Sequence, residues 1–196
     1  GVVFPGTLLK AAESYNMMNE LGYWTIDNAL SALAKIHEYG YQIKISVNLS
    51  PTQLYDQHLT NTLRLLVNKY NIKTHLLEIE LTEDVALSNS LLVKRQLADM
   101  ADMGISISMD DFGKGYSNLS FIRDLQLSAI KIDKAFILAL QDSPVNCAIV
   151  KATKLICDAK QCETYAEGIE TVEQLEMLKS MGVDKGQGFL FSQAVP

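Results

Sequence analysis

The chain has 196 residues, of which 48% are hydrophobic and 20% charged, and its formal net charge at pH 7 is −6. This is the composition of an ordinary globular domain, and the length is sufficient for one hydrophobic core. The absence of a Lys/Arg-rich run argues against duplex nucleic acid as a partner, and the absence of eighteen consecutive apolar residues argues against a transmembrane helix. Three cysteines without a CxxC pair indicate packed thiols in a reducing compartment, so we expect a cytoplasmic domain.

Local signals mark several helix boundaries along the chain. Three predicted helices end on a glycine C-cap, which leads into a strand: Gly40, Gly104 and Gly182. Three predicted helices begin after a capping hydroxyl: Ser50, Ser143 and Thr171. Within 144–160, helical spacing predicts one apolar face made of Val145, Ala148, Ile149, Ala152, Leu155, Ile156 and Ala159.

Six short strands are predicted between these helices. In chain order they cover 43–48, 76–81, 105–110, 129–133, 162–167 and 183–189. A regular alternation of strands and helices predicts parallel strands joined by right-handed crossovers. Two architectures meet this description: an open doubly wound sheet and a closed barrel.

The alternation of side chains along each strand separates the two architectures. In 105–110 the apolar residues share one face and the polar residues the other, and 43–48, 77–80 and 130–133 alternate in the same way. A doubly wound sheet carries helices on both faces and is apolar on both. One polar face per strand instead predicts an α/β fold of the TIM type, a (β/α)8 barrel with a polar lumen near one mouth.

The polar face ends in a chemically consistent set of residues at the carboxyl ends of five strands. They are Asn48, Glu80, Asp110, Lys131 and Glu167. In (β/α)8 barrels this mouth carries the catalytic residues, which come from several strands. Carboxylate and amide oxygens suit Mg²⁺ or Mn²⁺ better than zinc.

Two adjacent carboxylates, Asp110 and Asp111, stand where the third strand gives way to a loop. Neighbouring residues on a regular strand point to opposite faces, so the chain must bend if both carboxylates are to point inward. Gly113 and Gly115 permit the sharp loop that follows. One carboxylate could then bridge two metal ions, the arrangement that recurs in displacement at phosphorus.

Each of these residues also has a simpler interpretation. The Asp110-Asp111 pair could be a solvated turn, and Glu80, with Glu78 on the same strand, could face solvent at a sheet edge. Lys131 could pair with a nearby acid such as Asp133. Asn48 could belong to the entry of the next helix. A polar residue at the same place on five successive strands nevertheless favours a metal site.

Five segments carry a family resemblance: VNLSPTQL (47–54), LEIELTED (77–84), MDDFGKGYSNLSFIRDLQLSAIKIDKAFI (109–137), AEGIET (166–171) and DKGQGFLFSQAVP (184–196). In order and spacing they resemble the EAL-domain cyclic di-GMP phosphodiesterases of bacteria. The resemblance implies one EAL-like domain over 1–196, a TIM-type (β/α)8 barrel of the EAL kind. It also implies that the first strands, with the E-A-L tripeptide and the arginine after it, are missing from the given chain.

The resemblance also implies a role for each site residue. Asn48, Glu80 and Asp110 match ligands of a first metal ion. Asp110 would bridge to a second ion, which it shares with Asp111 and Glu167. Lys131 matches the residue that orients or helps to activate the attacking water.

Two further residues enter through the resemblance alone. Gln187 matches a glutamine near the cluster of metal, water and substrate. Glu83 matches the anchor of the glycine loop 112–118, which in the family couples dimerisation to the geometry of the metal site. A homodimer and an upstream regulatory domain are therefore expected, with this part of the protein in the cytoplasm.

The implied reaction is Mg²⁺- or Mn²⁺-dependent hydrolysis of cyclic di-GMP to linear 5′-pGpG. The alternative is an inactive cyclic di-GMP receptor or a protein-interaction domain. Two features motivate it: the E-A-L segment is not in the chain, and the glycine loop carries Lys114 and Asn118 where the family usually has small hydroxyl residues. The three histidines lie outside the constellation, which excludes the other phosphodiesterase class for this substrate, with His/Asp-bound metals.

Overall fold

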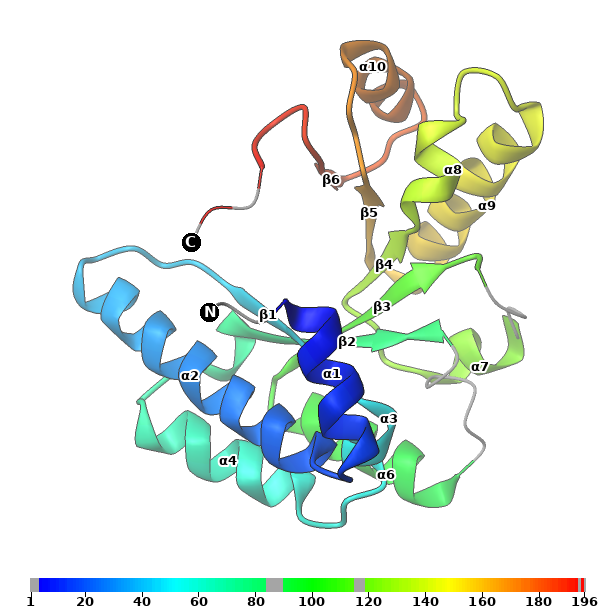
Figure 1. The fold of residues 1–196 in the computed structure, drawn as a ribbon. Helices are drawn as coiled ribbons and strands as arrows, with labels where there is room; N and C mark the ends of the chain where they lie inside the picture. Colours follow the sequence, from blue (N-terminus) through cyan, green and yellow to red (C-terminus); the bar gives the residue numbers. More distant parts are fainter. Residues whose placement is uncertain (1–3, 84–89, 115–118, 194, 196) are drawn as a thin grey trace. The chain divides into compact units, whose positions relative to one another are not determined.

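The computed structural model describes residues 4–83, 90–114, 119–193 and 195 as an alternation of helices and strands (Figure 1). The strands are β1 (Ile45–Asn48), β2 (Leu77–Thr82), β3 (Ser106–Phe112), β4 (Ala129–Ile132), β5 (Glu163–Glu167) and β6 (Lys185–Gln187). The helices are α1 (Pro5–Ser14), α2 (Met18–Glu38), α3 (Pro51–Leu54), α4 (Leu59–Lys69), the 3-10 turn η1 (Thr74–Leu76), α6 (Leu91–Asp102), α7 (Leu119–Asp124), α8 (Lys134–Leu138), α9 (Pro144–Lys160) and α10 (Val172–Ser180). The chain divides into two compact units, drawn from 1–80 with 88–106 and from 81–87 with 107–196.

The first unit is built around the parallel pair β1 and β2. Ile45 lies opposite Leu77 and Asn48 lies opposite Glu80, and β2 continues beyond this pairing to Thr82. Helix α2 packs against β1 and also contacts α3 and α4. The core of the unit is aliphatic and fully buried: Ile26, Leu30, Leu33, Leu63, Ile79 and Met100.

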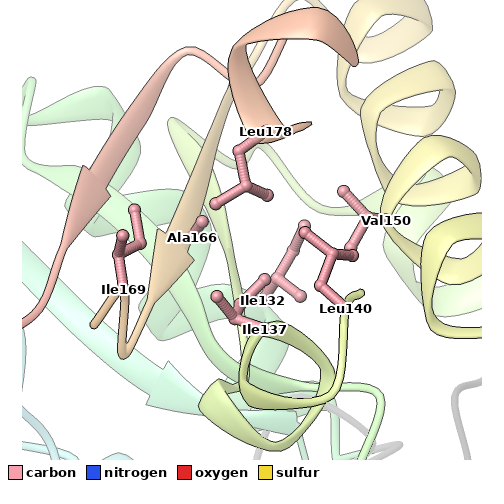
Figure 2. Packing of buried hydrophobic residues seen from close by; sticks show 7 residues of the cluster. All are labelled: Ile132, Ile137, Leu140, Val150, Ala166, Ile169 and Leu178. Atoms are coloured by element: carbon pink, nitrogen blue, oxygen red, sulfur yellow. The ribbon is translucent and has the colours of Figure 1, made fainter. Parts of the chain in front are cut away.

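The second unit contains four parallel strands, β3 to β6, which pair in chain order. Helices α8 and α9 pack against this sheet, where α9 contacts β4 and β5. Figure 2 shows the cluster that joins these elements, and its members are Ile132, Ile137, Leu140, Val150, Ala166, Ile169 and Leu178. The burial of this cluster fixes β4 and β5, and with them the side chains that these strands present.

The predicted boundaries agree with the observed ones. Each of the six strands differs by at most two residues at either end. Gly40, Gly104 and Gly182 have φ of 89°, 80° and 78°, the left-handed conformation expected of a helix C-cap. The capping hydroxyls accept backbone N–H groups as predicted: those of Ser50, Ser143 and Thr171.

The predicted apolar face of α9 is wrong. Val145 and Leu155 are 66% and 69% exposed, while Val150, Thr153 and Cys157 are buried. Small and apolar residues surround most of this helix, so helical spacing did not specify which stripe packs inward. The buried stripe includes Thr153, whose hydroxyl is satisfied by donating to the carbonyl of Ile149.

The polar face of β2 is covered as well as its apolar face. Glu78 is only 3% exposed and binds the Lys44 ammonium at 3.2 Å and the Ser46 hydroxyl at 3.1 Å. Glu80 is 8% exposed, so the interpretation of the two glutamates as a solvent-facing edge is wrong. In the part of the chain that the structure describes, no helix is long and apolar enough to cross a bilayer.

Candidate active site

The adjacent carboxylates lie on a bulge of β3. Between Met109 and Phe112 the pairing with β4 shifts in register, as expected where extra residues are inserted in one strand. Asp111 has φ of 55°, a left-handed conformation that Asp tolerates better than most residues. Its N–H donates to Asp110 Oδ1 at 2.9 Å. The predicted bend after Asp110 is therefore present.

Gly113 continues this bend. Its φ is 99°, and a Cβ at this position would collide with the ring of Phe136, so the loop needs glycine here. The Gly113 N–H donates to Glu83 Oε2 at 3.1 Å, a contact at the start of the loop that Glu83 is predicted to anchor. Gly115 and Asn118 lie outside the described residues, so the anchoring role assigned to Glu83 stays a prediction.

Lys131 lies at the centre of a largely buried polar cluster in the second unit. Its Nζ is 2.6 Å from Glu167 Oε1 and 3.5 Å from Asp110 Oδ1, and its side chain is 8% exposed. Gln187 Nε2 donates at 2.8 Å to the same oxygen of Glu167. The structure thus brings together one predicted site residue from each of β3, β4, β5 and β6.

Backbone contacts hold the loops after β5 and β6 against each other beneath this cluster. The Ile169 N–H donates to the carbonyl of Gln187, and the Leu190 N–H donates to the carbonyl of Ile169, both at 3.0 Å. A Cβ at Gly188 would overlap the backbone N and O of Ile169. This close approach fixes the positions of Glu167 and Gln187 relative to each other.

A cavity of about 480 Å³ opens beside the cluster within the second unit. Its lining combines the site residues Glu167 and Gln187 with Phe189, Lys134 and Gln193. An aromatic ring, an ammonium group and amides around a cleft of this size can receive a small polar ligand with a ring system.

A second lysine cluster adjoins the bulge. Lys114 Nζ is 2.7 Å from Asp111 Oδ1 and 2.7 Å from Asp133 Oδ2. The Asp111 carboxylate first, and then that of Asp133, raise the pKa of Lys114 well above its usual value. Burial acts to raise the pKa of Asp133, but the Lys114 ammonium and the Ala135 N–H outweigh it and hold that pKa below its usual value.

The remaining predicted ligands, Asn48 and Glu80, belong to the first unit. Asn48 ends β1 and lies opposite Glu80 in β2, and the Leu49 N–H donates to the carbonyl of Glu80 at 3.0 Å. The entry of α3 is capped by Ser50 rather than by Asn48. The role of these two residues as ligands stays a prediction.

The oxygen donors of the second unit fit a hard divalent cation by their chemistry. Asp110, Asp111 and Glu167 supply carboxylates, the ligands that Mg²⁺, Mn²⁺ and Ca²⁺ prefer. Over 4–83, 90–114 and 119–193, however, no three Asp, Glu, His or Cys side chains are already grouped to hold an ion. In this structure Lys131 and Lys114 neutralise the three carboxylates.

Sequence reasoning missed one part of the site. Lys114 was noted only as a departure in the glycine loop, and Asp133 only as a partner for Lys131, yet both belong to the Asp111 cluster. The three-residue spacing of Asp111 and Lys114 was the one available signal. It is weak, because that spacing brings charges together only where the local backbone turns.

Comparison with known proteins supports the same assignment of the fold. A family model described as the EAL domain matches residues 1–194. The cyclic di-GMP phosphodiesterase PdeR of Escherichia coli K12 is 30% identical over the whole chain, which covers 30% of PdeR. Across PdeR and three other curated relatives, the chain spans between 23% and 33% of their length.

Solved structures give the same result in three dimensions. The phosphodiesterase PaMucR in complex with c-di-GMP has a TM-score of 0.93 and 32% identity, with 100% of this chain and 80% of that chain covered. A calcium and cyclic di-GMP complex of Klebsiella pneumoniae BlrP1 has a TM-score of 0.88 and 25% identity, with 96% and 48% covered. EAL domains are TIM-type barrels, so the predicted fold class is confirmed. The chain belongs to the EAL domain family.

Proposed function

We propose that this EAL domain hydrolyses one phosphodiester bond of cyclic di-GMP and releases linear 5′-pGpG. The observation that carries the proposal is the cluster of Lys131, Asp110, Glu167 and Gln187, contributed by four successive strands. PdeR is named as a cyclic di-GMP phosphodiesterase, and PaMucR was solved with c-di-GMP bound.

We further propose that Asp110, Asp111 and Glu167 bind Mg²⁺ or Mn²⁺, and that Asn48 and Glu80 serve as ligands as well. The all-oxygen donor set supports this assignment, as does the calcium in the BlrP1 complex. A bound divalent ion supplies two effects, polarisation of a phosphoryl oxygen and a lower pKa of a bound water. The carboxylates would then exchange lysine contacts for contacts with the ion.

The residues of the chain have distinct tasks in this reaction. Lys131 Nζ, held by two carboxylates, can donate a hydrogen bond that orients the attacking water or stabilises charge on a phosphoryl oxygen. Gln187 holds the Glu167 carboxylate in one orientation through its 2.8 Å hydrogen bond. The cavity beside Glu167 and Gln187 offers Phe189 as a face for a guanine base.

A chromatographic assay of cyclic di-GMP turnover tests the proposal. The chain with Mg²⁺ or Mn²⁺ should form 5′-pGpG, whereas the chain in excess chelator should form none. The variant Glu167→Gln should lose turnover, because it removes a carboxylate that Lys131 and Gln187 both hold. A complete absence of linear product at every metal concentration would reject hydrolysis.

The second candidate function is a receptor that binds cyclic di-GMP without cleaving it. Its support is the neutralisation of all three carboxylates by lysines in the absence of any group arranged for an ion within the described ranges. Tight binding in chelator without turnover would favour this function over hydrolysis. A homodimer, an upstream regulatory domain and a cytoplasmic location remain part of the proposal for the whole protein.

A further inference from the structure

One of the chain's own cations lies on a carboxylate that the proposed function assigns to a metal ion. Lys114 Nζ forms ion pairs of 2.7 Å with both Asp111 and Asp133. The Lys114 N–H also donates to the carbonyl of Asp111 at 3.3 Å. The backbone hydrogen bond and the ion pair together hold Lys114 next to Asp111. The lysine ammonium therefore meets this carboxylate more readily than one on a distant segment.

The two carboxylates differ in their freedom. Asp133 is 2% exposed, and its other oxygen accepts the Ala135 N–H at 2.9 Å as the cap of α8. The side chain of Asp133 is thus fixed, and it holds the ammonium next to Asp111. The side chains of Asp111 and Lys114 are 40% and 51% exposed, so the lysine can swing into water when a stronger cation arrives.

We propose that Lys114 is a positioning residue that competes with the divalent cation for the Asp111 carboxylate. The domain then fills its site at Asp111 only at a higher cation concentration than it would without the lysine. This inference rests on the proposed function, because it takes Asp111 as a metal ligand.

The expected size follows from the electrostatics of a partly exposed site. A unit positive charge about 6 Å from a divalent cation weakens its binding by a factor of about ten when the effective dielectric is close to that of water, as beside an exposed side chain. The competition needs no change of protonation, because the ammonium is displaced as a whole. It requires only that Lys114 exchange its contact with Asp111 for water.

Calorimetric titration of the intact chain with Mn²⁺, without nucleotide, tests the competition directly. Lys114→Met should bind Mn²⁺ about tenfold more tightly than the wild-type chain, since it removes one neighbouring positive charge. Lys114→Arg keeps the charge and should bind like the wild type. Lys179→Met, which removes an exposed ammonium paired with Glu176 on α10, is the matched control and should not change the affinity.

A double-mutant cycle separates competition at Asp111 from a general charge effect. Asp111→Asn removes the carboxylate, and Asn accepts the left-handed backbone found here. In this background Lys114→Met should lose most of its effect on Mn²⁺ affinity. If Lys114→Met raises the Mn²⁺ affinity by the same factor in the Asp111→Asn background, the lysine does not compete for the Asp111 carboxylate.

The outcomes also separate this inference from the proposed function. Equal or weaker Mn²⁺ binding by Lys114→Met, in a chain whose wild type binds Mn²⁺, overturns the inference and leaves the proposed function standing. No Mn²⁺ binding by either protein overturns the metal-dependent function and the inference together. Circular dichroism of each variant shows whether its fold is retained.

Discussion

Two lysines of the second unit pair with the three carboxylates proposed to bind metal, Asp110, Asp111 and Glu167, and their surroundings differ sharply. Lys131 is 8% exposed and lies among partners that come from separate strands. Lys114 is 51% exposed and pairs with Asp111, three positions earlier in the chain, and with Asp133. The ion pairs of Lys131 are therefore a fixed part of the sheet, whereas the ion pair of Lys114 with Asp111 can be displaced.

The difference determines which lysine can give up a carboxylate contact at little cost in stability. Breaking a buried pair leaves a charge without its partner in a poorly solvated place, whereas an exposed pair exchanges its partner for water. Lys131 thus suits a fixed task in catalysis. Lys114 suits a task that requires it to move.

The largest expected effect is on catalysis by Lys131→Met. If Lys131 orients or activates the attacking water, turnover at saturating Mn²⁺ should fall by a factor of about 10² to 10⁴. The measurement is the initial rate of 5′-pGpG formation, with Lys179→Met as the control for a lost lysine charge. A rate within tenfold of the wild type would break the distinction between the two lysines.

The next effect concerns stability without metal. Lys131→Met should lower the free energy of unfolding in chelator by about 3–5 kcal/mol, because it leaves Asp110 and Glu167 without their shared cation. Lys114→Met should cost less, about 1–3 kcal/mol, because its pair with Asp111 is exposed, although Asp133, which is 2% exposed, also loses its cation. Urea unfolding measures both values.

Two additions make this stability test specific. Mn²⁺ should restore part of the stability of Lys131→Met, because an ion that binds only the folded state shifts the equilibrium toward it. The double variant with Glu167→Gln should also be more stable than Lys131→Met alone, since it removes one of the remaining negative charges. If neither addition helps, the loss comes from packing rather than from charge.

A smaller effect is expected where the loops after β5 and β6 touch. Gly188→Ala would press a methyl group on the backbone of Ile169 and should cost about 1–3 kcal/mol of stability. Turnover should fall as well, because this contact supports Glu167, which pairs with Lys131, and Gln187, which donates to Glu167. Gly6→Ala in α1 is the matched control, since a Cβ there meets nothing within 4 Å.

The smallest effect concerns an ion pair away from both lysine clusters. Burial acts to raise the pKa of Asp184, but the Thr164 N–H and the Lys154 ammonium outweigh it and hold that pKa below its usual value. A depressed carboxyl pKa stabilises the fold above the unfolded pKa of about 4, and this contribution is lost as pH falls through the folded value.

Asp184→Asn should therefore be less stable than the wild type at pH 7 by at most about 1 kcal/mol, because the carboxylate is 35% exposed and screened. The difference should shrink below about pH 4, where the wild-type carboxyl is also protonated. Urea unfolding at pH 7 and at low pH measures it. If the stability difference between Asp184→Asn and the wild type stays constant with pH, the loss of stability comes from altered packing or hydrogen bonding rather than from the lost charge.

Much of this architecture was predictable because it depends on local patterns. The alternation of Ile and polar residues in β3 and β4 placed Asp110 and Lys131 on the covered polar face. Glycine and hydroxyl caps located the ends of the helices, and two neighbouring acids at the end of a strand predicted a bend after Asp110. These features require only the geometry of a few consecutive residues.

The rest depends on contacts between distant segments. Strand alternation could not say which carboxylates Lys131 binds, because that depends on the register of β3 and β5 around β4. The buried stripe of α9 was missed because apolar residues also cover its exposed side. The ion pair of Lys114 with Asp133 joins residues nineteen positions apart, so no local pattern indicates it.

The left-handed backbone at Asp111 has a consequence for how a protein of this kind can lose its activity. Few residues other than Asn and Gly adopt this conformation easily, and neither carries a negative charge. A single change to one of them would remove the carboxylate that we propose as a metal ligand, while the scaffold remains intact. One substitution at this position could therefore convert a domain that hydrolyses its ligand into one that only binds it, for example in a duplicated gene.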